Sequence, residues 1–157
     1  MGTDLLVFNL GQQQFALPVG QVSSVVPRAT LTPLPGAPAD LIGLLRLRGA
    51  LCPVIDIRAR LGLVAAAPHI GECIVVLHTT TFRLGLLVDG IEDVVVAAAM
   101  GTRETSVTGD RLIRGVLEVS GQVVAVLDAE AAIGNDVRAY LAATADGLHR
   151  LAEQTAA

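Results

Sequence analysis

The chain carries one pattern of apolar and turn residues twice, and this repeat limits the possible folds more than any other feature. Residues 4–26, DLLVFNLGQQQFALPVGQVSSVV, align without a gap with residues 73–95, CIVVLHTTTFRLGLLVDGIEDVV. Residues 42–62 align in the same way with residues 114–134, and the shared residues are Gly43 with Gly115, Gly49 with Gly121, Asp56 with Asp128 and Gly62 with Gly134. We predict an internal duplication, with a first repeat over about residues 4–62 and a second over about residues 73–134.

Short apolar segments separated by turn residues fill each half, which is typical of β-strands. In the first half we expect strands over Leu5–Leu10, Gln14–Val19, Val22–Pro27, Leu44–Leu47 and Ala50–Ile55, with counterparts in the second half. Segments such as Ile74–Leu77 and Val123–Leu127 are apolar on both alternating faces, so both faces should be covered, as in a barrel or a sandwich. The predicted fold class for residues 1–157 is therefore a single all-β domain with a C-terminal helix.

Each half is followed by a segment with the end signals of a short helical turn, Asp56–Gly62 and Asp128–Gly134. The Asp can cap the amino end of the turn, and the Gly favours the left-handed conformation that ends it. Because Asp56 and Asp128 occupy matched positions of the repeat, capping explains both without catalysis. A longer amphipathic helix is expected over about residues 135–154, with apolar positions at Val137, Tyr140, Leu141, Leu148 and Leu151.

Composition excludes several classes of protein. Hydrophobic residues make up 52% of the chain and charged residues 17%, so the chain is expected to be ordered. The net charge is −4, and the 11 basic residues, all Arg, form no basic stripe, so nucleic acid is not an expected partner. The apolar runs are shorter than the roughly 20 residues that span a bilayer, so no direct membrane insertion is expected. Cys52 and Cys73 lie in apolar runs, which fits reduced thiols and a cytoplasmic protein.

No catalytic, metal or cofactor site is predicted. Asp89 precedes Gly90 at a break between apolar runs, where a turn explains both residues. His69, His78 and His149 have no spacing that would place two nitrogens on one metal, and no phosphate-binding loop or nucleophile motif occurs. Two alternatives stay open: a sensory β-barrel that binds a small molecule between its halves, and an enzyme that uses Asp89 and Asp93.

Arg48 breaks the symmetry of the repeat. The alignment places Arg48-Gly49 at the same hairpin turn as Ser120-Gly121, where the first position favours Asn, Asp, Ser or Gly because it can require a positive φ. Its neighbour Arg46 stands where the second half has Glu118. A long cation at such a turn indicates a functional position, although a solvated surface arginine is the alternative.

Three stretches closely resemble the CheW family of bacterial chemotaxis coupling proteins: FNLGQQQFALPVGQV, the Leu31–Leu63 segment LTPLPGAPADLIGLLRLRGALCPVIDIRARLGL, and LGLLVDGIEDVV. The resemblance covers about residues 4–134 and implies two small intertwined β-barrels. It also implies a non-catalytic adaptor in the cytoplasm, recruited to membrane-associated receptor arrays. Its implied partners are the cytoplasmic tip of methyl-accepting chemoreceptors and the regulatory domain of the histidine kinase CheA.

The resemblance also implies residues for a receptor groove. The arginine of the Leu-Arg-Gly motif matches Arg48, a valine beside the groove matches Val22, and apolar positions of the next repeat match Cys73 and Ile74. Ser24 stands where many members have Glu, and Arg46 stands where the motif has Asn. These two departures leave open which receptor binds, and whether the array controls flagella, surface motility or another output.

Overall fold

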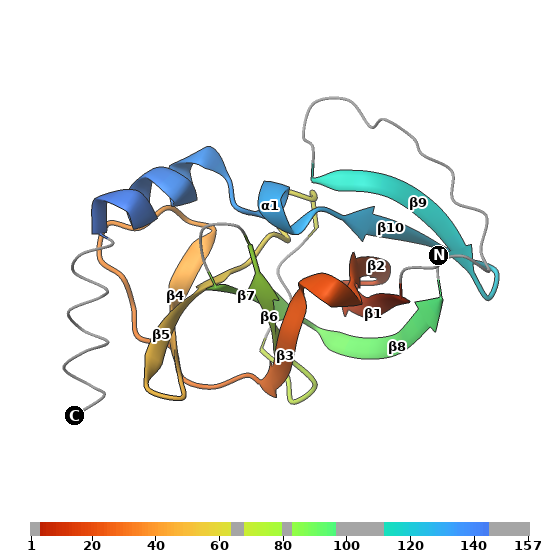
Figure 1. Cartoon of the computed structure of the whole chain (residues 1–157), viewed down its shortest axis with the longest axis horizontal. Helices are drawn as coiled ribbons and strands as arrows, with labels where there is room; N and C mark the ends of the chain where they lie inside the picture. Colours follow the sequence, from red (N-terminus) through yellow and green to blue (C-terminus); the bar gives the residue numbers. More distant parts are fainter. Residues whose placement is uncertain (1–3, 64–67, 80–82, 97–111, 145–157) are drawn as a thin grey trace.

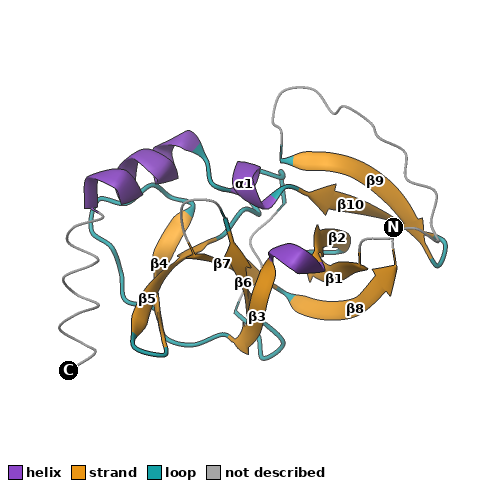
Figure 2. Cartoon of the chain, viewed as in Figure 1, coloured by secondary structure: helices purple, strands orange, loops and turns teal. Residues whose placement is uncertain are grey.

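The computed structural model describes residues 4–63, 68–79, 83–96 and 112–144 (Figure 1). These residues form ten strands, a 3-10 turn η1 (Val19–Gln21), a short helix α1 (Ala129–Ala132) and a helical segment over 135–144. The strands are β1 (Asp4–Leu10), β2 (Gln13–Pro18), β3 (Val22–Pro27), β4 (Leu41–Leu47), β5 (Ala50–Ile55), β6 (Cys73–His78), β7 (Arg83–Val88), β8 (Gly90–Val96), β9 (Ile113–Val119) and β10 (Gln122–Leu127). Figure 2 shows two β units side by side, with α1 and the 135–144 segment along one side of them. Within the described residues, no helix is long and apolar enough to cross a membrane.

Two five-stranded sheets have the same strand order once the repeats are matched. Sheet A runs β8-β1-β2-β10-β9, and sheet B runs β3-β6-β7-β5-β4. Each sheet takes the first two strands of one repeat and the last three strands of the other. The two subdomains are therefore intertwined, as the resemblance implied, and neither is built from one continuous half of the chain. The duplication and its boundaries remain our interpretation of this match.

Three apolar layers explain why so many strands are apolar on both faces. One layer lies inside the curve of sheet A and contains Leu5, Val7, Ala16, Leu117 and Val124. A second lies inside the curve of sheet B and contains Leu45, Cys52, Val54, Ile74, Val76 and Leu87. The third and largest lies between the sheets and includes Phe8, Phe15, Leu17, Val75, Leu77, Leu84 and Leu86. Because successive side chains of a strand point to opposite faces, a strand such as β6 contributes to two layers and has no polar face.

The segment that joins β3 to β4 closes sheet B. Thr32 pairs with Leu44 of β4 through two backbone hydrogen bonds of 2.9 and 2.8 Å. Gly43 permits this approach, since a Cβ there would lie 2.8 Å from the Cβ of Leu31 and 2.9 Å from the carbonyl oxygen of Thr32.

The two predicted helical turns differ in detail. Asp128 caps α1, because its side chain accepts a hydrogen bond from the Glu130 N–H, and Gly62 has the left-handed φ of 72°. Asp56 accepts the Arg58 N–H at 3.0 Å at the start of the first turn. Gly134 is not the C-cap that we predicted, because α1 ends at Ala132 with Ile133 as its cap. Gly134 instead lies directly before the 135–144 segment, so no left-handed residue is needed there. The part of the predicted helix after residue 144 lies outside the described residues.

Candidate functional site

The β4–β5 turn presents Arg48 in a strained backbone conformation. Arg48 and Gly49 have φ angles of 51° and 79°, and Ser120 and Gly121 repeat them in the β9–β10 turn at 51° and 81°. A left-handed residue other than glycine costs about 1 kcal/mol or more. Arg46 and Arg48 are both exposed, and neither makes a hydrogen bond or ion pair in the part of the chain that the structure describes. Nothing inside the fold therefore accounts for an arginine at this turn.

Val22 and Ser24 lie on β3, an edge strand of sheet B. Val22 is half-buried against the layer between the sheets and stands opposite Leu77, whereas Ser24 stands opposite Val76. An irregularity in the β3–β6 pairing falls between them. The edge position leaves this part of β3 accessible to a partner, which is a common way for sheets to bind other chains.

Cys73 and Ile74 begin β6, and they differ in exposure. Cys73 is partly exposed, and its Sγ lies 3.4 Å from the Gly71 carbonyl oxygen. Ile74 is fully buried in the layer inside sheet B. A direct contact between Ile74 and a partner would require that barrel to open, so we leave Ile74 out of the candidate surface. The other cysteine, Cys52, is also buried, and burial raises the pKa of its thiol to about 11, so it is unreactive at neutral pH.

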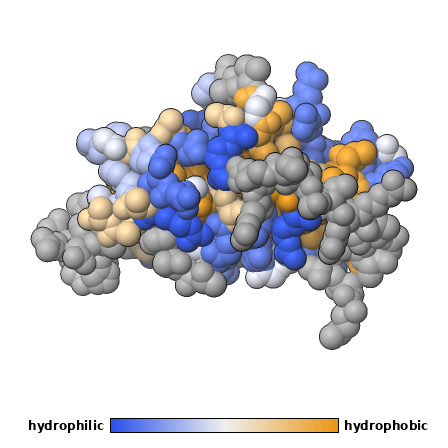
Figure 3. All heavy atoms as spheres, turned by 90° about the horizontal axis from the view of Figure 1, so that it is seen from above, coloured by the Kyte–Doolittle hydropathy of each residue, from blue (hydrophilic) through white to orange (hydrophobic). Residues whose placement is uncertain are grey.

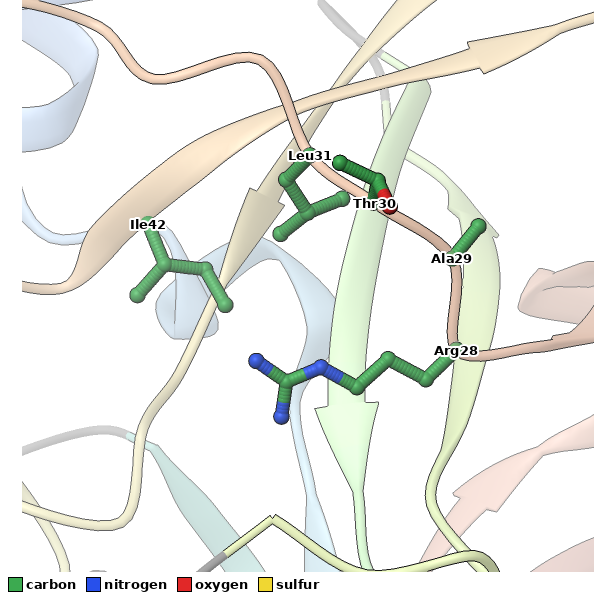
Figure 4. Close-up of a pocket in the computed structure, with 5 residues that line it drawn as sticks. All are labelled: Arg28, Ala29, Thr30, Leu31 and Ile42. Atoms are coloured by element: carbon green, nitrogen blue, oxygen red, sulfur yellow. The ribbon is translucent and has the colours of Figure 1, made fainter.

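All six residues suggested for the groove lie on sheet B, in two groups. Val22, Ser24, Cys73 and Ile74 lie on the paired strands β3 and β6, and Arg46 and Arg48 lie at the far side of the sheet, on the β4–β5 hairpin. An open hollow lies where the β3–β4 segment passes β4, and it is lined by Arg28, Ala29, Thr30, Leu31 and Ile42. Figure 4 shows the side chains of Arg28, Leu31 and Ile42 directed toward this space.

A partly buried network of charges joins distant parts of the chain, and its contacts were not predicted from the sequence. Arg58 is only 5% exposed. Its guanidinium forms ion pairs with Asp56 at 2.8 Å and with Asp89 at 3.2 Å. Asp89 also accepts the Gly11 N–H at 2.6 Å and lies 3.0 Å from Nε2 of His69. The Asp89 that we assigned to a turn therefore holds three other segments together.

A second buried carboxylate extends this network. Glu72 is 2% exposed, accepts the Arg28 guanidinium at 2.9 Å and accepts the backbone N–H of His69 at 2.9 Å. His69 thus contacts both carboxylates, Glu72 through its backbone and Asp89 through its ring. We call Arg28, Asp56, Arg58, His69, Glu72 and Asp89 the seam network.

The pKa values of Asp89 and Arg58 are shifted by burial, hydrogen bonds and paired charges together. Burial alone would raise the pKa of Asp89, but the Gly11 N–H, the His69 hydrogen bond and the charge of Arg58 lower it further than burial raises it. The hydrogen bond to Asp56 raises the pKa of Arg58, with burial opposing and the nearby carboxylates adding to the rise. Within the described residues, no group of three or more His, Cys, Asp or Glu side chains could hold a metal ion. The pairing of Arg58 with Asp56 and Asp89 fits a structural role.

The edge strands β3 and β8 expose apolar side chains. Val25 on β3 is 40% exposed, and Ile91 and Val94 on β8 are 37% and 53% exposed. Ile91 stands opposite Phe8 and Val94 opposite Leu6, so both lie on the face of sheet A that forms the layer between the sheets. β3 is an edge strand of sheet B and β8 is an edge strand of sheet A (Figure 1). We call Val22, Val25, Ile91 and Val94 the β3–β8 surface. On the face in Figure 3, by contrast, hydrophobic residues form separate areas among hydrophilic ones.

Comparisons with known proteins agree on one family. The model of the CheW-like domain matches residues 4–136. The chain is 30% identical to the chemotaxis protein CheW of Rhizobium meliloti over 141 residues, which cover 87% of this chain and 91% of that protein. It is 31% identical to a probable chemotaxis protein CheW of Rhizobium etli, over 82% of this chain and 85% of that protein. The fold is similar to the crystal structure of the scaffolding protein TtCheW from Thermoanaerobacter tengcongensis, with a TM-score of 0.77, 21% identity, and coverage of 87% of this chain and 96% of that one.

Proposed function

The chain belongs to the CheW-like family, and we propose that it is a non-catalytic adaptor that couples methyl-accepting chemoreceptors to the histidine kinase CheA. In this proposal, one surface binds the cytoplasmic tip of a receptor and another binds the regulatory domain of the kinase. The adaptor would act in the cytoplasm, in a receptor array at the membrane. Its relatives carry the names chemotaxis protein and scaffolding protein, which supports this role.

The observation that carries the proposal is the Arg48 turn. The fold accepts Ser120 at the matched turn with the same φ of 51°, so it does not require a long cation there. Strained residues that the fold does not need are concentrated at functional sites. Arg48 also matches the arginine of the family's Leu-Arg-Gly motif, which is implicated in receptor contact.

The β3–β8 surface fits the receptor side of the proposal. Its apolar side chains extend the core layer between the sheets to the exterior, and Glu92 and Asp93 lie beside them on β8. An apolar strip with a polar edge suits the apolar face of a helix. We propose that the hairpin tip of a receptor contacts Val22 on this surface and extends toward Arg48, which lies at the same end of sheet B. Ser24 and Arg46 would then alter the choice of receptor, which leaves room for a dedicated receptor or for an output other than flagella.

Reconstitution with receptor fragments and CheA tests the proposal. The wild-type chain should bind both partners and raise kinase activity in the presence of receptor. Arg48→Ala should weaken receptor binding or kinase stimulation while the fold survives, and Ser120→Ala, the matched change in sheet A, should leave both unchanged. Unchanged receptor binding and kinase stimulation in Arg48→Ala would contradict the role of Arg48. A wild-type chain that binds neither partner would overturn the adaptor function itself.

A further inference from the structure

One end of sheet B gathers three arginines and a histidine, from strands β4, β6 and β7 and from the β4–β5 turn. His78 ends β6 and pairs with Arg83, which begins β7. β7 runs parallel to β5, with Val54 beside Gly85, so Arg83 lies level with Cys52, and its charge acts on that thiol. Cys52 in turn pairs with Leu45, the residue before Arg46. Arg46, Arg48, His78 and Arg83 therefore share one end of the sheet, which we call the cationic end.

The same end of sheet A provides an internal control. The repeat matches each residue of the cationic end with one in sheet A, namely Arg46 with Glu118, Arg48 with Ser120, His78 with Asn9 and Arg83 with Gln14. The two sheets have the same strand order and the same turn geometry. Since the fold accepts acidic or neutral residues at all four positions in sheet A, it does not require arginine or histidine at these positions in sheet B.

The cationic end is also uncompensated. Arg46, Arg48, His78 and Arg83 are all exposed, and none of the three arginines forms an ion pair with any described residue. The chain as a whole carries a net charge of −4, so the three arginines stand out against an acidic molecule. Leu47 and Leu51, which are partly buried, lie beside Arg46 on the same hairpin and add apolar area to the surface.

We propose that the cationic end recognises an acidic segment of a protein partner, and that Arg46 and Arg83 set the preference for acidic partners. This inference rests on the adaptor function proposed above and specifies the chemistry of the receptor that the chain selects. A compact acidic segment fits better than a membrane or a nucleic acid. Membranes and nucleic acids are bound most strongly by broad basic surfaces, and the net negative charge of this chain would weaken binding to either of them. Charge complementarity of this kind selects partners and accelerates their association.

The test measures affinity for receptor cytoplasmic fragments that differ in the number of Asp and Glu residues near the hairpin tip. The wild-type chain should bind the more acidic fragments more tightly, and its affinity should fall steeply with salt. The double variant Arg46→Gln with Arg83→Gln should lose about tenfold in affinity for an acidic fragment, and its salt dependence should be weaker. Arg114→Gln, at an exposed arginine on β9, controls for net charge and should change affinity less than twofold.

Charge reversal sharpens the test. Arg46→Glu with Arg83→Glu should reject the acidic fragment, and a fragment with Lys at its acidic positions should regain binding to that variant. Circular dichroism checks that each variant is folded. If a variant does not fold, the salt dependence of wild-type binding to the acidic fragment still tests the proposal. Equal binding of acidic and neutral fragments would overturn the inference, as would variant binding equal to wild type. So would wild-type binding to anionic vesicles or duplex DNA that the double variant loses. If the wild type binds neither receptor fragment nor CheA, the adaptor function fails instead.

Discussion

Sheet A and sheet B share one strand order and one turn geometry, but their charged residues have different tasks. Where β5 leaves sheet B, Asp56 and Arg58 enter a partly buried network that reaches Asp89 and, through His69, Glu72. Where β10 leaves sheet A, Asp128 caps α1, and Glu130 pairs with Arg138 at 3.4 Å in a contact about one-third exposed. The shared backbone shows what the fold needs. The charged residues that differ between the two sheets are therefore not required by the backbone that they share.

The largest loss of stability should come from Arg58→Met, because this change removes the arginine that pairs with both Asp56 and Asp89. Removing one member of a buried ion pair costs about 3 kcal/mol or more, because the remaining charge stays buried. We expect the free energy of unfolding to fall by about 3 kcal/mol, measured by urea denaturation. Arg138→Met, which breaks the Arg138–Glu130 pair beside sheet A, is the control, and it should cost less than about 1 kcal/mol because that pair is partly solvated. Equal losses in the two variants would contradict a special role for the seam network.

A pH series tests the same network through Asp89. The pKa of this carboxyl is lowered in the folded protein, so its contribution to stability is present above the unfolded value of about 4 and is lost as the pH falls through the folded value. Asp89→Asn should lower stability by about 2 kcal/mol at pH 7. The gap between the two proteins should then be constant above about pH 5 and narrow as urea midpoints are measured at pH values below about 4. The exposed Asp136→Asn serves as the control. A gap that stayed constant over this range would show that the charge of Asp89 is not what stabilises the fold.

The sequence predicted the local elements well and the long-range contacts poorly. The expected Val22–Pro27 and Ala50–Ile55 strands have those bounds in the structure, because short apolar runs between turn residues leave few alternatives. The expected strand over Leu44–Leu47 begins three residues earlier, at Leu41, where Gly43 and the pairing of Thr32 extend β4. The seam network had no local signal, since Arg58, His69 and Asp89 meet only after the chain has crossed between the sheets. The need for glycine at position 85 also had no local signal. A Cβ there would lie 2.8 Å from Ile74 Cγ2 and would also crowd Val54, whereas the matched position in sheet A accepts Ala16.

The candidate site was only partly predictable, for the same reason. Arg46 and Arg48 stood out because the repeat offers Glu118 and Ser120 at the same positions. The repeat also matches His78 with Asn9 and Arg83 with Gln14, but a polar or charged residue at the end of an apolar strand is ordinary in a sequence, so these differences did not stand out. Only the strand order brings His78 and Arg83 to the end of sheet B that bears Arg46 and Arg48.

The smallest expected effect, and the most direct test of the difference between the sheets, is a gain in stability from Arg48→Asn. Asn adopts a positive φ more readily than Arg, and the first position of this turn has a φ of 51°. We expect the free energy of unfolding to rise by about 0.5 kcal/mol, seen as a higher urea midpoint with an unchanged slope. Ser120→Asn should give a similar gain in sheet A. Only the sheet B variant should weaken receptor binding, since only Arg48 is proposed to contact the partner. Such a gain in stability with a loss of binding is expected where a strained residue is kept for function. If Arg48→Asn instead destabilised the fold, Arg48 would have a structural role, and its unusual conformation would no longer favour a binding site.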